Sequence, residues 1–362
     1  MEKDQYLGAH NRVIPAPHYT SNVANSSVQL DWKAVDFGAE HFQGVQRKGR
    51  HLILSGGMKY TEPQRAQLIV VEMGSRPAEG PWSIPAYPAS HKDPHPADRI
   101  VSVVDLDQRL WHAGGIQRDG DVLAVGLFGG GASQVRFYDV RDPTRPVEIE
   151  GARIARRAKS HAAGLTTLAD GRHLAVAWDD AHLDFYRSRS PDVADGFEPG
   201  FQRVHKREAE GGVTPGGCPD DVEAALHGRV GPCGTFQNVN LVTDCDDDTY
   251  LLGFRNTNKN ILGEGGDFAA LYEVRWPGGY DAKPAVRLVD RKHMYCYGPC
   301  NFGGGAGIYR AGSAFFIYGV APYLHGGNDR VNFNEYALGS SGRDHRSVRE
   351  PGGRPGASPG RD

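Results

Sequence analysis

Three histidines hold the same place in a pattern that recurs along this chain. His41, His112 and His161 each precede a glycine by two or three residues, and an apolar run follows. Neutral imidazole binds zinc- and iron-type ions, and it also acts as a general acid or base near neutral pH. If the fold brings the three rings together, they can hold one divalent metal ion or catalyse directly. The alternative is a packing role at the start of each repeat.

Further polar candidates follow the second apolar run of several copies of the pattern. Asp179 and Asp180 come directly after Trp178, and we take Asp179 as a candidate acid, base or metal ligand. A solvated turn is the alternative for this pair. Arg255 is suited to binding an anionic substrate group, with a surface ion pair as the alternative. The predicted substrate-binding residues are Tyr60, Gln237, Arg255, Tyr323 and His325.

The pattern indicates how these residues are positioned. Copies start near residues 41, 112, 161, 237 and 304, and each reads as a strand, a tight turn and a second strand. A third strand follows in every copy, at Gln67–Met73, Gln134–Val140, His182–Arg187, Phe268–Trp276 and Val331–Leu338. A fourth strand follows in four copies, at Arg99–Leu106, Val147–Ala155, Phe201–Lys206 and Ala285–Arg291.

The last copy lacks a fourth strand, and an extra strand, Val28–Val35, precedes the first copy. Pairing these two ends would close a ring of sheets and leave no long open edge. We therefore predict an all-β fold, a five-bladed β-propeller with four strands per blade, closed by the N-terminal strand. It would span residues 26–338, after an N-terminal arm (1–25) and before a disordered tail (339–362).

In such a ring the first strand of each blade lines the axis, so the three histidines should surround one mouth of a central channel. Gln237 and Gly304 hold the equivalent positions in the other two copies. The Gly/Pro-rich stretch 207–236, with a short helical segment at Pro219–Val230, should enter on the same mouth and serve as a lid.

One segment carries a resemblance to a known family. Gln134 to Pro146 reads QVRFYDVRDPTRP, and it resembles the third-strand motif of the LVIVD-repeat bacterial β-propellers. Gln67–Met73 is a looser copy. The resemblance implies the architecture and leaves the function open, because propellers serve binding, scaffolding and catalysis alike.

Composition limits the partners. The formal net charge is -3 and no long basic run occurs, which argues against nucleic acid as a partner. No apolar run is long enough for a transmembrane helix, and the N-terminus lacks the apolar core of a secretion signal. We expect a cytoplasmic monomer without a membrane partner. The cysteines should be free thiols, and a Cys218–Cys233 bridge is the alternative for an exported chain.

These observations favour a small-molecule enzyme with its site at the histidine-lined mouth. It would be metal-assisted or use the imidazoles as acid and base, as a lyase, cyclase, isomerase or hydrolase, with secondary metabolism as its setting. A glycosidase is less favoured, because few carboxylates lie near the predicted mouth. The alternative is a non-catalytic propeller that binds a ligand or protein partner through its loops.

Overall fold

The computed structural model describes residues 23–29, 41–58, 64–74, 76–80, 82, 97–205, 236–256, 267–294, 302–311, 314–320 and 330–338. Within them the fold is all-β, with two 3-10 turns, η5 (Val193–Asp195) and η6 (Phe302–Gly304), as its only helical segments. None of the helices in this part of the chain is long and apolar enough to cross a membrane. The predicted lid, its helical segment, the chain before residue 23 and the tail after residue 338 lie outside the described residues.

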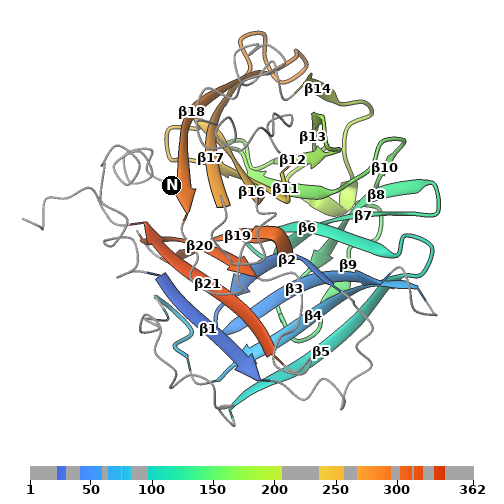
Figure 1. The fold of residues 1–362 in the computed structure, drawn as a ribbon. Helices are drawn as coiled ribbons and strands as arrows, with labels where there is room; N and C mark the ends of the chain where they lie inside the picture. The colour runs from blue at the N-terminus through green and yellow to red at the C-terminus, as the bar shows by residue number, and fades with distance from the viewer. Residues whose placement is uncertain are drawn as a thin grey trace, which may run out of the picture.

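The strands form antiparallel units, and in all but the last unit the members follow one another along the chain (Figure 1). The first unit consists of β2 (His41–Lys48), β3 (His51–Met58), β4 (Arg65–Met73) and β5 (Asp98–Asp107). The second unit consists of β6 (His112–Asp119), β7 (Val122–Gly129), β8 (Ala132–Asp139), β9 (Val147–Glu148) and β10 (Ile154–Arg156), and the third of β11 (Ala162–Thr167), β12 (His173–Trp178), β13 (His182–Arg187) and β14 (Gln202–His205). The fourth unit consists of β15 (Asn238–Thr243), β16 (Thr249–Asn256), β17 (Asp267–Arg275) and β18 (Ala285–Met294). The fifth unit consists of β19 (Ala306–Ala311), β20 (Ala314–Val320), β21 (Arg330–Leu338) and β1 (Val23–Gln29).

The two ends of the chain meet in the last unit. β1 pairs antiparallel with β21, and Val28 lies opposite Val331. The predicted pairing is therefore confirmed, although β1 begins and ends earlier than the predicted strand Val28–Val35. The predicted strand Val147–Ala155 is also imprecise, because β9 and β10 pair separately with β8.

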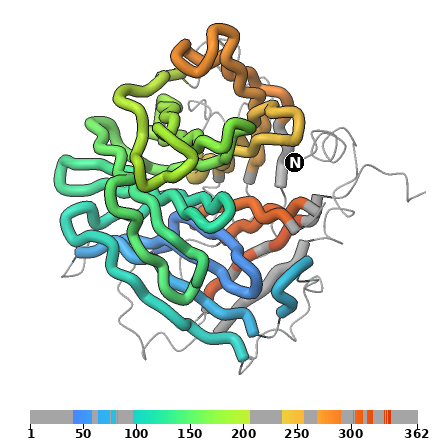
Figure 2. Tube along the Cα trace, turned by 180° about the vertical axis from the view of Figure 1, so that it is seen from behind, coloured from blue at the N-terminus to red at the C-terminus, as the bar shows by residue number. Residues whose placement is uncertain are grey.

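Apolar side chains hold neighbouring units together. In the described residues the buried apolar side chains form five clusters, and each is shared by two neighbouring units: first with second, second with third, third with fourth, fourth with fifth, and fifth with first. On β3, for example, Leu52 and Leu54 face the fifth unit whereas Ile53 faces the second. Seen from behind, the chain passes round the molecule in sequence order (Figure 2).

Amide side chains fill the space where the first strands meet. Gln117 on β6 donates from Nε2 to the Leu241 carbonyl at 2.6 Å, and its Oε1 accepts from the Leu165 and Leu241 amides at 2.8 and 2.6 Å. Asn238 on β15 likewise accepts from the Ile116 amide and donates to the Gln43 carbonyl. These side chains join three or more units across the axis, so this part of the predicted channel is packed rather than open.

A buried arginine strengthens the contact between the first and last units. The Arg47 guanidinium is fully buried between the rings of Trp82 and Tyr309, with its Cζ 4.3 and 4.2 Å from their centroids. It donates to the Tyr318 hydroxyl at 2.8 Å and lies 3.5 Å from the Glu335 carboxylate. The charge is therefore paired as well as stacked, which buried cations require.

The Gln117 amide should be a strong determinant of stability. Replacing Gln117 with Leu leaves two buried N–H groups and a carbonyl without their partner, at about 1–3 kcal/mol for each unsatisfied group. We expect the free energy of unfolding, measured with urea, to fall by at least about 2 kcal/mol. Gln202→Leu is the control, because its amide makes one exposed hydrogen bond to the Asp281 carbonyl. It should change stability by less than about 0.5 kcal/mol, and equal losses for the two variants would contradict the axial role.

Candidate functional site

Glycines let the histidine-bearing strands approach at one end of the molecule. Gly57 lies opposite His41 in the β2–β3 pair, and a Cβ atom there would come within 2.7 Å of the Trp111 carbonyl oxygen and 2.9 Å of the His112 Cα. A Cβ on Gly114 would overlap the His161 carbonyl oxygen, which accepts a 2.8 Å hydrogen bond from the Gly115 amide. The missing side chains therefore allow the starts of the first three units to meet.

The three predicted histidines lie in one aromatic cluster. The ring centroids of His41 and His112 are 5.1 Å apart, and Trp111 packs edge-on against His112 at 5.5 Å. Phe128, the penultimate residue of β7, contacts His112 at 4.3 Å and His161 at 4.5 Å between centroids. The predicted convergence is confirmed, and Phe128 is the member of the cluster that sequence reasoning missed.

The cluster does not have the form of the predicted metal site. Ligation needs each nitrogen within about 2.0–2.2 Å of one point, whereas the Phe128 ring packs against both His112 and His161. No group of three or more His, Cys, Asp or Glu in the described part of the chain is arranged to hold a metal ion. The structure therefore gives no support to a metal bound by His41, His112 and His161 among the described residues, and this metal stays a prediction.

His161 has a carboxylate partner. Its Nε2 lies 2.9 Å from Oδ2 of Asp180, and the two side chains are 22% and 42% exposed. The pairing follows from local structure, since the His161 amide donates to the Trp178 carbonyl and thus places the start of β11 beside the end of β12. Asp180 has φ of 79°, which is uncommon for a residue with a side chain. The close contact with His161 is the largest of the causes that lower the pKa of Asp180, so this carboxylate is ionised at neutral pH.

The Asp179 carboxylate holds the β12–β13 turn, and its predicted catalytic role stays a prediction. Oδ1 accepts from the Ala181 and His182 amides at 3.1 and 2.7 Å and lies 3.2 Å from His182 Nδ1. Oδ2 lies 3.6 Å from Arg203, and only 7% of the side chain is exposed. The acid that reaches the cluster is its neighbour Asp180.

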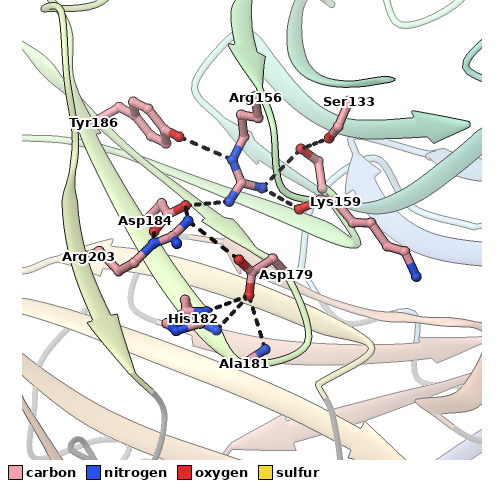
Figure 3. Close-up of polar contacts among 10 residues, drawn as sticks. Ser133, Arg156, Lys159, Asp179, Ala181, His182, Asp184, Tyr186 and Arg203 are labelled. Atoms are coloured by element: carbon pink, nitrogen blue, oxygen red, sulfur yellow. Dashed lines mark hydrogen bonds and ion pairs between the residues drawn. The ribbon is translucent and has the colours of Figure 1, made fainter. Parts of the chain in front are cut away.

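A buried ion pair fixes the segment that leads into His161 (Figure 3). Arg156 donates to Asp184 Oδ2 at 2.6 Å, and the two side chains are 2% and 1% exposed. The same guanidinium donates to the Lys159 carbonyl at 2.5 Å and to the Ser160 hydroxyl at 3.1 Å. Arg203 completes the pairing of Asp184 with bonds of 2.7 Å. Sequence reasoning missed this group, although a polar Asp184 between apolar residues of one strand was a usable signal.

The other predicted site residues are less connected to the cluster. Gln237 donates its backbone amide to the Phe254 carbonyl at 2.7 Å, at the position in the fourth unit equivalent to the histidines. Arg255 is buried, with its Cζ 4.7 Å from the Phe268 ring centroid, rather than on the surface. Their substrate-binding roles stay predictions. Tyr60, Tyr323 and His325 lie outside the described residues, as do the cysteines other than Cys245, which is an exposed free thiol.

No family model matches the sequence, and no curated protein matches it. Several solved structures have a related path of the chain. An exo-beta-1,3-galactanase from Clostridium thermocellum has 10% identity and a TM-score of 0.43, with 86% of this chain and 62% of the galactanase covered. An exo-1,5-alpha-L-arabinanase from a bovine ruminal metagenomic library has 9% identity and a TM-score of 0.39, with 82% and 93% covered.

A beta-1,2-mannobiose phosphorylase from Listeria innocua has 10% identity and a TM-score of 0.42, with 88% of this chain and 92% of the phosphorylase covered. At this level of similarity no function is transferred from these proteins to this chain.

His112 is held in its neutral form. Burial, with smaller contributions from the nearby charges of His41, His161 and Lys159, lowers its pKa to about 3. A neutral imidazole can still donate one hydrogen bond, but it cannot serve as a base that cycles near pH 7. His112 therefore suits packing and orientation within the cluster.

This burial predicts how stability changes with pH. The pKa of His112 is about 3 in the folded protein and about 6.5 in the unfolded chain. The contribution of neutral His112 to the free energy of unfolding is therefore complete above pH 6.5 and is lost as the pH falls toward 3. Urea unfolding of the wild type should therefore lose up to about 1.4 kcal/mol per pH unit more than His112→Phe does between pH 6 and 4.

His182→Phe is the control for this titration, because His182 pairs with Asp179 outside the cluster. It should keep the wild-type dependence on pH. Identical slopes for the wild type and His112→Phe would contradict a buried, neutral His112.

Proposed function

We propose that this chain is a five-bladed β-propeller enzyme that acts on a small organic molecule at the histidine mouth. The fold part of the proposal is supported by the cyclic order of the apolar clusters, each shared by two neighbouring units. It is also supported by the β1–β21 pair that joins the two ends of the chain. The resemblance of Gln134–Pro146 to the LVIVD-repeat propellers agrees with this architecture.

The observation that carries the enzymatic proposal is the 2.9 Å contact between His161 Nε2 and Asp180 Oδ2. A carboxylate that holds an imidazole fixes its orientation and stabilises the imidazolium formed when the ring takes a proton. His161 would act as the general base toward substrate or water. His41, which contacts the neutral His112, would supply the second acid–base group.

Hydrolysis is the reaction class that this arrangement suits best. An oriented imidazole activates a water molecule without a metal ion, and a second imidazole can protonate the leaving group. Glycoside hydrolysis generally relies on a pair of carboxylates. Of the mouth carboxylates whose side chains are described, Asp179 is committed to its turn and Asp180 to His161. We therefore favour a non-glycosidic bond as the substrate's reactive group.

A second candidate is a non-catalytic propeller that binds a ligand at the same mouth. The buried, neutral His112, packed between His41, Trp111 and Phe128, favours this alternative, because a packing role explains that histidine fully. The two candidates differ in whether a bound compound is converted.

The test is a screen of small organic compounds against the full chain, with binding detected by thermal shift and conversion by mass spectrometry. For a converted compound, His161→Asn should lower kcat/KM by at least about 100-fold, because a general base contributes about 10²–10⁴. Asp180→Asn should lower it less, since the imidazole remains but loses its partner.

His182→Asn is the matched control, because it removes an imidazole that also pairs with an aspartate, 3.2 Å from Asp179 Oδ1, but outside the cluster. It should leave kcat/KM within about twofold of the wild type. Conversion that survives His161→Asn would overturn the assignment of the base. Ligands that bind without any conversion would establish the non-catalytic alternative.

A further inference from the structure

Lys159 lies beside the histidine cluster, and its ammonium group indicates the charge of the ligand. The ammonium of Lys159 lies 5.8 Å from the Phe128 ring centroid, and Phe128 contacts His112 and His161. Arg156 holds the segment that carries Lys159, because its guanidinium donates to the Lys159 carbonyl at 2.5 Å. The side chain is exposed, so its ammonium remains accessible to a ligand.

The groups around this position include several hydrogen-bond donors. Lys159 carries an ammonium group, and His41 and His161 carry imidazoles that can each donate from a ring N–H. Asp180 is the carboxylate that pairs with the cluster, and it is already bound to His161. Among the residues that the structure describes, no carboxylate forms an ion pair with the Lys159 ammonium.

We propose that the mouth binds its small-molecule ligand through an oxyanion, a carboxylate or a phosphate, held between the Lys159 ammonium and the imidazoles of His41 and His161. The inference rests on the proposed function and names the substrate class of that site. An oxyanion accepts hydrogen bonds from ammonium and imidazole N–H groups, and charge-assisted bonds of this kind are stronger than neutral ones.

The surroundings of this position suit such a ligand. His112 is neutral, so it can donate a hydrogen bond without adding a buried charge. Trp111 and Phe128, both half-buried, offer aromatic surface beside the cations. A planar organic acid can place its carboxylate on Lys159 and its apolar part against these rings. The carboxylate of Asp180, by contrast, would repel an anion placed on its own side of His161.

Titration of the full chain at pH 6 with benzoate, benzamide and inorganic phosphate tests the proposal. The histidine ring signals are followed by NMR. Benzoate, phosphate or both should shift the His41 and His161 signals saturably, whereas benzamide, the neutral analogue of benzoate, should not. Binding of benzoate alone identifies a carboxylate ligand, binding of phosphate alone identifies a phosphate ligand, and binding of both identifies the charge as the common requirement.

Lys159→Gln should raise the Kd of the anion at least about fivefold, and Lys159→Glu should raise it further. Arg157→Gln is the matched control, because Arg157 is an exposed cation of the same segment, and its Kd should stay within about twofold of the wild type. Thermal unfolding of each variant checks that the fold is kept. Equal binding of benzamide and benzoate, no anion binding, or equal Kd values for Lys159→Gln and Arg157→Gln would each overturn the inference.

The result also separates this inference from the proposed enzyme. Conversion of a compound that depends on His161, without anion binding, would support the proposed enzyme and contradict the proposed oxyanion ligand. Anion binding that depends on Lys159, with no conversion in the screen, would support the oxyanion in a non-catalytic binding protein.

Discussion

The structure depends on sheets that bury apolar side chains on both faces. A sheet with one solvated face needs one partner, whereas a sheet that is apolar on both faces needs two. On β12, Leu174, Val176 and Trp178 face the fourth unit while Ala175 and Ala177 face the second. When every unit has two neighbours, the only arrangement without an end is a ring. The β1–β21 pair and the Arg47 contact with Tyr318 and Glu335 follow from that requirement.

The first strands of the units also pack closely against one another. The first strands approach closely enough for Gln117 to bond with backbone groups of two other strands, and for β6 and β11 to pair directly at Gly115 and Ala162. The Gln117 and Asn238 amides on this axis bond to backbone groups of other strands. The three histidines lie at the strand starts at one end of this packed region, where His41 pairs with Gly57 and His112 pairs with Phe128.

The sequence predicted the strands and the meeting of the histidines because both follow from a repeat, in which equivalent positions lie at equivalent places. It could not predict what fills the space between those positions. Phe128 ends an apolar run that reads like any buried strand, yet its ring packs against both His112 and His161. Nor could it choose between Asp179 and Asp180. That choice depends on the left-handed backbone of Asp180 and on two hydrogen bonds that Asp179 accepts from backbone amides. Both arise only in the folded turn.

His112 and His161 illustrate how one repeat position acquires two chemical roles. Both begin the first strand of a unit, and both contact Phe128. His112 is enclosed by Trp111, Phe128 and His41, so burial and neighbouring positive groups favour its neutral form. His161 instead meets the Asp180 carboxylate, which the β12–β13 turn supplies. The repeat thus places the imidazoles, and the non-repeating turns decide which groups each of them contacts.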